Sequence, residues 1–120
     1  MARILLVEDE RNLRLFMALN LKAYGYGVVE AQDGTEALQI LQNDPFDLVV
    51  TDLPMPNTNG VELIDWLKRE RPHIPVIAVS AADASLSEAR DLRADAVLKK
   101  PFAVQELLRV AQTVLQRQNQ

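Results

Sequence analysis

Residues 3–10 read Arg-Ile-Leu-Leu-Val-Glu-Asp-Glu, an apolar run of strand length that stops at three consecutive acids. Similar short apolar runs recur along the chain, and they lead into polar residues. They span residues 26–31, 48–50, 74–79 and 94–98. Most of them lack strict alternation of apolar and polar residues, which is typical of strands covered on both faces. The sequence therefore predicts five strands in a parallel sheet.

Helical patterns fill the intervals between these runs. They cover residues 10–24, 33–41, 59–69, 85–92 and 103–117. The first pattern places apolar residues three and four apart, and Gly25 is positioned to end that helix. These apolar residues are Leu13, Phe16, Met17, Leu21 and Tyr24. Capping boxes open the second pattern at Asp33 and the fourth at Ser85. Strand–helix repeats without a linker predict one α/β domain over residues 1–120, with right-handed crossovers.

Composition narrows the function classes. The chain has 120 residues, 48% hydrophobic and 25% charged, which is ordinary for one globular domain. It has no cysteine, which excludes a disulfide framework, thiol catalysis and cysteine-bound zinc. A net charge of −4 argues against direct nucleic-acid binding. No apolar run approaches the ~20 residues of a membrane span, so we expect a cytoplasmic domain that does not contact a membrane.

Polar residues stand where the predicted strands end. In such a sheet, ligands bind at the carboxyl ends of the strands. Those ends carry Glu8 and Asp9, Asp52, Ser80, and Lys100 followed by Pro101. We therefore expect three carboxylates, one hydroxyl and one ammonium to converge on one edge of the sheet.

This combination suits phosphoryl chemistry assisted by a metal ion. Clustered carboxylates repel one another, and a hard divalent cation such as Mg²⁺ relieves that repulsion with oxygen ligands. The single histidine, His73, falls in a predicted loop, away from the strand ends. A carboxylate can accept a phosphoryl group as an aspartyl phosphate. A cation and Lys100 would then neutralise the developing charge, and Ser80 could donate a hydrogen bond to a phosphoryl oxygen.

Each of these residues also has an ordinary structural explanation. Asp9 could cap a helix or occupy a solvated turn. Asp52, which is followed by Leu-Pro-Met-Pro, could initiate a turn. Ser80 could be a local capping hydroxyl. It is the joint pattern over four strand ends that favours a reaction site.

Four segments resemble the receiver domain of two-component response regulators, of the type of the chemotaxis regulator. They are residues 4–10, 52–60, 75–81 and 100–102, and the resemblance covers essentially the whole chain. The resemblance implies a doubly wound (βα)5 domain, with a five-stranded parallel sheet of order 2-1-3-4-5 and helices on both faces. It also implies a phosphorylation-activated switch rather than an enzyme, since such a domain catalyses only its own phosphorylation and dephosphorylation.

The resemblance further implies how the acids are used. Asp52 would accept a phosphoryl group from a sensor histidine kinase or a phosphotransfer protein. Asp9 would bind Mg²⁺ (or Mn²⁺) directly, with Glu8 acting nearby. The Asp52 carboxylate and the main-chain carbonyl of Pro54 would complete the protein ligands of the ion.

Other positions are implied to contact the phosphate and pass on the signal. Ser80, Ala81 and Lys100 match the phosphate-binding positions of the family, and Ser80 matches the switch hydroxyl. Pro101 follows a peptide bond that is commonly cis in the family. Val97 stands where the family usually has an aromatic switch residue, which puts the usual signal relay in doubt.

The sequence says less about the downstream output of such a switch than about its phosphorylation site. Ala96 and Val110 replace an acid and an arginine that winged-helix members use in dimer contacts, which puts that dimer in doubt. The sequence names neither the kinase nor the downstream effector domain or partner protein.

Two other function classes share part of this pattern. A hydrolase of the haloacid-dehalogenase type also uses an Asp nucleophile and magnesium, but it typically has a second acid where this chain has Pro54. A nucleotide- or flavin-binding protein would need a glycine-rich phosphate loop, and none of the four glycines makes one. A labile adduct formed from a small phosphodonor would favour the switch over the binder, and steady turnover of phosphate esters would favour the hydrolase.

Overall fold

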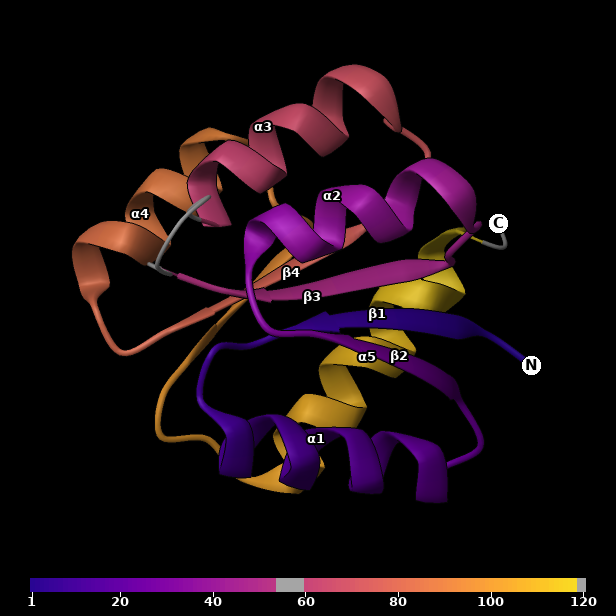
Figure 1. Cartoon of the computed structure of the whole chain (residues 1–120). Coiled ribbons are helices and arrows are strands. Elements are labelled where there is room, and N and C mark those ends of the chain that lie inside the picture. Colours follow the sequence, from indigo (N-terminus) through magenta and orange to yellow (C-terminus); the bar gives the residue numbers. More distant parts are fainter. Residues whose placement is uncertain (54–59, 119–120) are drawn as a thin grey trace.

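In the computed structural model, which describes residues 1–53 and 60–118, strands alternate with helices along the chain (Figure 1). The elements are β1 Arg3–Val7, α1 Arg11–Ala23, β2 Gly27–Ala31, α2 Gly34–Asn43, β3 Leu48–Asp52, α3 Gly60–Glu70, β4 Val76–Ser80, α4 Asp83–Asp91, β5 Ala96–Lys99 and α5 Val104–Gln118. All strand pairs are parallel, and the five-stranded sheet has the order β2-β1-β3-β4-β5. The predicted fold class and strand order are confirmed.

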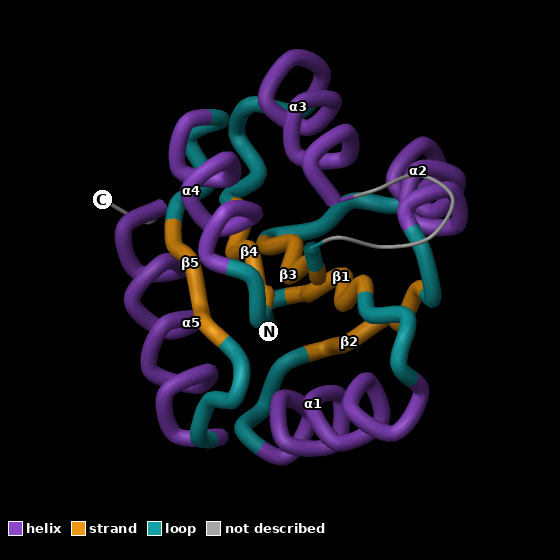
Figure 2. The backbone as a smooth tube through the Cα atoms, turned by 90° about the vertical axis from the view of Figure 1, so that its left-hand side faces the viewer, coloured by secondary structure: helices purple, strands orange, loops and turns teal. Residues whose placement is uncertain are grey.

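Helices cover both faces of the sheet. Helices α1 and α5 lie on one side, and α2, α3 and α4 lie on the other (Figures 1 and 2). Each face has its own buried cluster. Leu48 and Val50 of β3 pack toward α1 and α5, whereas Val49 packs toward α2, α3 and α4. Every residue of β3 and β4 is buried. Both faces of these strands are covered, which explains why their apolar runs are not interrupted by polar residues.

Two local features follow the sequence closely. The Asp33 side chain caps α2 by accepting a hydrogen bond from the Glu36 amide at 2.8 Å, as the predicted capping box requires. Helix α1 ends before Gly25, which has a φ of 112°. Glycine adopts this left-handed conformation without steric cost, so the predicted stop is confirmed.

The predicted start of the fourth helix is wrong. Helix α4 begins at Asp83, two residues before the predicted capping residue Ser85, and its N-cap Ala82 makes no side-chain capping bond. An ion pair of 2.8 Å joins Asp83 to Lys99 at the end of β5. An acid in the first turn is also favourable at the helix N-terminus. The ion pair and the favourable placement of Asp83 accompany the earlier start of α4.

Two aromatic residues predicted to face the core are exposed. Phe16 and Tyr24 in and beside α1 are 52% and 50% exposed, respectively. The buried face of α1 is centred on Met17, Ala18 and Leu21. Consecutive residues of a helix are about 100° apart, so Phe16 points well away from Met17.

Among the described residues, no helix is both long and apolar enough to span a bilayer.

Candidate functional site

The ends of β1 and β3 bring three acids together at one edge of the sheet. Glu8 follows the last residue of β1, Asp9 comes next, and Asp52 ends β3. One carboxylate oxygen from each lies within 4.8 Å of the others. Glu8 and Asp52 are buried, whereas Asp9 is exposed. We call Glu8, Asp9 and Asp52 the acidic cluster.

Glu10, the third acid after β1, has a structural role instead. The Glu10 carboxylate caps α1 by accepting hydrogen bonds from the amides of Asn12 and Leu13. The ordinary capping explanation considered for Asp9 therefore applies to its neighbour Glu10.

Lys100 supplies a positive charge to the acidic cluster. Its ammonium nitrogen lies 2.9 Å from Glu8 Oε1 and 2.9 Å from Asp52 Oδ1. Its amide donates a 2.9 Å hydrogen bond to the carbonyl of Ser80, which joins the turn after β5 to the end of β4. The Lys100–Pro101 peptide bond is cis, as the resemblance implies.

The charges shift the protonation of this group. Burial raises the pKa of Asp52 to about 7, with the Glu8 carboxylate adding to the rise and the Lys100 ammonium opposing it. Burial also acts to raise the pKa of Asp9, but hydrogen bonds with Glu8 and Asp52 outweigh it and leave that pKa below its usual value. Burial acts to lower the pKa of Lys100, but its bonds with Asp52 and Glu8 raise it overall. Near neutral pH, Asp52 is thus poised between its two protonation states.

The donor set fits a hard divalent cation. Asp52 Oδ1 is buried and, among the described residues, has no hydrogen-bond partner of good geometry, although Lys100 Nζ is close. A buried acceptor without a hydrogen bond is costly. Carboxylate oxygens are ligands that Mg²⁺ prefers, and Glu8, Asp9 and Asp52 could each offer one. Three carboxylates facing one ammonium leave an excess of negative charge that such an ion would offset.

The remaining predicted residues that the structure describes lie on β4, on β5 and in the turn after β4. Ser80 ends β4, is buried, and accepts a 3.0 Å hydrogen bond from the Ala82 amide through its hydroxyl oxygen. Ala81 is exposed in the turn beyond it. Val97 pairs with Ala78 within the sheet and lies partly buried, so it is not part of the acidic cluster. Pro54 lies outside the described residues.

One residue at this edge was not predicted from the sequence. Arg14, in the first turn of α1, donates hydrogen bonds to the Glu8 carbonyl at 3.0 Å and to a Glu30 carboxylate oxygen at 3.2 Å. The sequence offers one indication of this contact, which is an arginine one turn into the helix that follows the acidic strand end. Many surface arginines share that signal.

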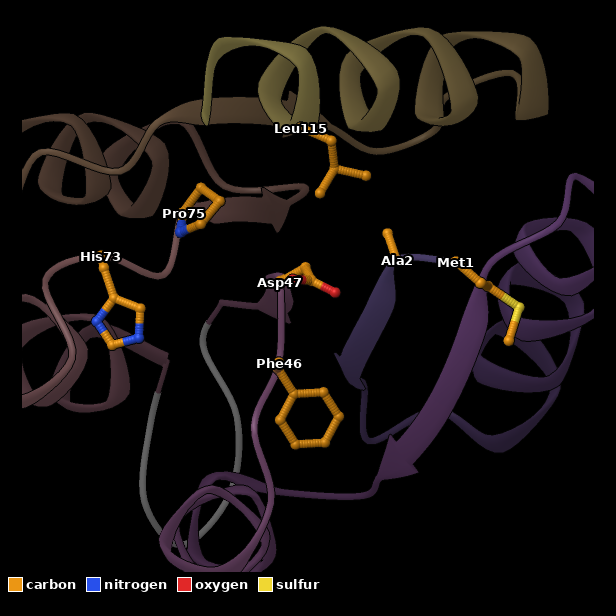
Figure 3. A pocket seen from close by; sticks show the side chains of 7 residues that line it. All are labelled: Met1, Ala2, Phe46, Asp47, His73, Pro75 and Leu115. Carbon is orange, nitrogen blue, oxygen red and sulfur yellow. The ribbon is translucent and has the colours of Figure 1, made fainter. Parts of the chain in front are cut away.

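Among the cavities formed by the described residues, one lies beside the acidic cluster and another at the opposite edge of the sheet. A cavity of about 400 Å³ beside the acidic cluster is mainly apolar and is lined by Leu13, Phe16, Ala81, Lys100, Pro101 and Phe102. Another, of about 480 Å³, lies at the opposite edge of the sheet and includes Asp47 and His73 in its lining (Figure 3). His73 is exposed in a turn, as predicted.

Comparison with known families and sequences is consistent with this geometry. The model of the response regulator receiver domain matches residues 4–112. The response regulator MprA of Mycobacterium sp. strain KMS is 40% identical over 118 residues, which are 96% of this chain and 51% of the relative. The MprA protein of Mycobacterium bovis strain BCG is 38% identical over the same shares of the two chains. The chain thus spans about half the length of these curated relatives.

Solved structures show the same fold. A CheY-like receiver domain protein from Methanospirillum hungatei is 27% identical, with a TM-score of 0.94 over 99% of this chain and 97% of that one. TrrA from Thermotoga maritima, solved in complex with Mg²⁺ and BeF, is 30% identical, with a TM-score of 0.88 over 95% of this chain and 99% of that one.

Proposed function

Because the chain belongs to the response regulator receiver domain family, we propose that it is a phosphorylation-activated switch in which Asp52 accepts a phosphoryl group. The donor is a sensor histidine kinase or a phosphotransfer protein. A receiver domain is a signalling switch rather than a classical enzyme, and its own phosphorylation and dephosphorylation are the chemistry that we assign to it. We treat residues 1–120 as one such domain and, by family resemblance, place it in the cytoplasm.

The observation that carries the proposal is the state of Asp52. Its Oδ1 atom is buried and lacks a well-formed hydrogen bond among the described residues, 2.9 Å from the Lys100 ammonium. An oxygen held in this way is available to form a new bond. The ammonium beside it can stabilise the charge of an incoming phosphoryl group.

In the proposed reaction, an Asp52 carboxylate oxygen bonds to phosphorus while the bond from phosphorus to the donor nitrogen breaks. Asp52 must first lose its proton, and its pKa of about 7 leaves that proton easily displaced. Mg²⁺ (or Mn²⁺), when bound, neutralises charge on the phosphoryl oxygens. Glu8, Asp9 and Asp52 would hold the ion together with the Pro54 carbonyl.

The residues around Asp52 would then hold the product. The Lys100 ammonium lies 2.9 Å from Asp52 Oδ1 and would pair with a phosphoryl group formed there. Ser80 would exchange its hydrogen bond from the Ala82 amide for one donated to a phosphoryl oxygen, and the Ala81 amide would donate another. These contacts exist only in the phosphorylated state, so they can shift the conformation of the loop that follows β4.

The donor needs a docking surface beside Asp52, and we assign that role to the apolar cavity near Lys100. Phe16 on α1 is 52% exposed, and it lines this cavity with Leu13 and Phe102. Leu15 and Leu19 extend the apolar surface along α1, at 44% and 68% exposed. A helical phosphotransfer protein could pack there with its reactive histidine above Asp52.

Incubation with acetyl phosphate and Mg²⁺, followed by intact mass measurement, tests the acceptor. We expect one phosphoryl adduct on the wild type and on Asp44→Asn, an exposed acid away from the site. We expect none on Asp52→Asn. An adduct that persists in full on Asp52→Asn would overturn the assignment. Steady turnover of phosphate esters would point to a hydrolase instead.

A further inference from the structure

We propose that Arg14 is a positioning residue for the acidic cluster, tying the main chain at Glu8 to Glu30 of β2 and thereby setting the affinity of the cluster for a divalent cation. The inference rests on the cation-binding part of the proposed function. It concerns how the ligands are oriented, and it assigns Arg14 no contact with the ion or the phosphoryl group.

The Arg14 side chain folds back over the turn between β1 and α1. This side chain is only 15% exposed. Nη1 donates to the Glu8 carbonyl at 3.0 Å, and Nε donates to Glu30 Oε1 at 3.2 Å. One rigid planar group therefore joins the end of β1 to the neighbouring strand β2. Arginine suits this bridge because its donors are fixed in a fork.

With Arg14 in place, every polar atom of Glu8 is held. The Glu8 amide donates to the Ala31 carbonyl at 3.1 Å, and its carbonyl accepts from Arg14. One carboxylate oxygen accepts from Lys100 at 2.9 Å and the other from the Glu10 amide at 3.0 Å. Arg14 is the contact that fixes the carbonyl.

Fixing that carbonyl also fixes Asp9. The Glu8 carbonyl and the Asp9 amide belong to one planar peptide group, so a hydrogen bond to the first restrains the orientation of the second. The Asp9 side chain is exposed and is not held by packing in the core. The direction in which its carboxylate points therefore depends on the main chain that Arg14 restrains, together with its side-chain interactions with Glu8 and Asp52.

The charge of Arg14 and its positioning role predict opposite effects of its removal on Mg²⁺ affinity, so the two can be told apart by experiment. Arg14 is a cation near a cation site, so Coulomb repulsion alone predicts that Arg14→Gln binds Mg²⁺ more tightly. Positioning predicts weaker binding. Arg14→Lys keeps the charge but cannot reach both partners with one planar fork. For Arg14→Lys, charge alone therefore predicts unchanged Mg²⁺ affinity, whereas the positioning role again predicts weaker binding.

The measurement is metal affinity without any phosphodonor. Mn²⁺ binding is followed by the loss of the free-ion electron paramagnetic resonance signal, and Mg²⁺ binding by competition. We expect about tenfold weaker binding for Arg14→Lys and Arg14→Gln, the scale seen when partners that orient metal ligands are removed. Arg11→Lys and Arg11→Gln, at an exposed arginine of the same helix, should bind as the wild type does.

A second comparison separates positioning from general stability. The side chains of Arg14 and Glu30 are 15% and 27% exposed, and Arg14→Lys keeps a cation that can still pair with Glu30. The free energy of unfolding in urea, measured without metal, should therefore change little in Arg14→Lys. If Glu30 acts by holding Arg14, the double variant Arg14→Lys with Glu30→Gln should lose no more affinity than Arg14→Lys alone.

The outcomes distinguish this inference from the proposed function. If the wild type binds neither ion, or if Asp9→Ala binds both normally, the proposed cation site is wrong. If the wild type binds through Asp9 and Arg14→Lys retains full affinity, the cation site stands and the role of Arg14 is refuted. Tighter binding by Arg14→Gln would show that Arg14 acts through its charge alone.

Discussion

The Asp52 carboxyl group lies in surroundings that favour its neutral form, although the proposed reaction needs it ionised. Burial and the Glu8 carboxylate raise its pKa to about 7, and Lys100 offsets only part of this effect. A bound divalent cation would favour the ionised form. Ionisation of Asp52 and cation binding are therefore expected to occur together.

The first prediction concerns pH. An unfolded chain releases the Asp52 proton near its ordinary pKa of 3.8, but the metal-free folded protein keeps it until about pH 7. The folded state binds more protons in this window, so Asp52 makes stability fall as the pH rises through it. Relative to the wild type, Asp52→Asn should gain up to about 4 kcal/mol in free energy of unfolding between about pH 4 and pH 8.

Urea unfolding of the wild type and Asp52→Asn across this pH range checks the prediction, with Asp44→Asn as control. A stability difference that does not change with pH would contradict it.

The second prediction concerns Asp9. Millimolar Mg²⁺ should stabilise the wild type by about 1 kcal/mol, because the ion binds the folded state and not the unfolded chain. Asp9→Ala removes a ligand and should abolish this gain. The pKa of Asp9 is lowered, so the folded protein favours its ionised form, and the metal-free variant should be slightly less stable than the wild type at neutral pH. Thermal unfolding with and without Mg²⁺ measures both effects, and an unchanged response to Mg²⁺ would show that Asp9 is not a ligand.

At the scale of single residues, the sequence was informative where a residue acts through its place on a strand. The strand ends predicted which carboxylates meet, because parallel strands bring their carboxyl ends to one edge. The pairing of Arg14 with the Glu8 carbonyl could not be predicted in this way. It depends on the path that a long side chain takes back across a turn.

Helices were predicted less exactly than strands. The runs that became β3 and β4 were recognisable because both faces of these strands are buried. The start of α4 was misplaced because the capping box at Ser85 was the stronger local signal. The Asp83–Lys99 ion pair that accompanies the true start joins residues 16 apart in the chain, and no local pattern reveals it.

Helix α1 provides the third prediction. Phe16 is exposed on the apolar surface assigned to donor docking. Phe16→Ser should slow phosphoryl transfer from a phosphorylated phosphotransfer protein several-fold, because apolar contact area is lost from the docked complex. Transfer from acetyl phosphate should not change, since a small donor needs no docking surface. Tyr24→Ser, at the exposed end of the same helix, is the control. Equal slowing with both donors would argue against docking at Phe16.

Helix α4 provides the fourth prediction. The proposed contacts of the phosphoryl group with Ser80 and Ala81 lie directly before α4, whereas Val97 has no ring to reorient. We therefore expect amide chemical shifts to change mainly over residues 80–93 when a beryllofluoride adduct mimics the phosphoryl group. Large changes centred on Val97 with residues 80–93 unaffected would refute this, as would a full shift pattern in Ser80→Ala.

The whole molecule is needed to assemble the site. Lys100 and Glu8 are in contact although 92 positions separate them in the chain. They meet because the chain leaves β1 and β5 at the same edge of one parallel sheet, whose two faces are both buried. No local segment could hold the acidic cluster and Lys100 in this geometry.

Burial is also distributed unevenly, and this sets how readily each part opens. Every residue of β3 is buried, whereas Ala89 is the only buried residue among the α4 side chains that the structure describes. In native-state hydrogen exchange, amides of β3 should therefore exchange only when the whole protein unfolds, and those of α4 through low-energy local opening. Equal protection of both elements would contradict this expectation. If it holds, a signal can leave through the segment that opens most readily while the acceptor stays on the strand that opens last.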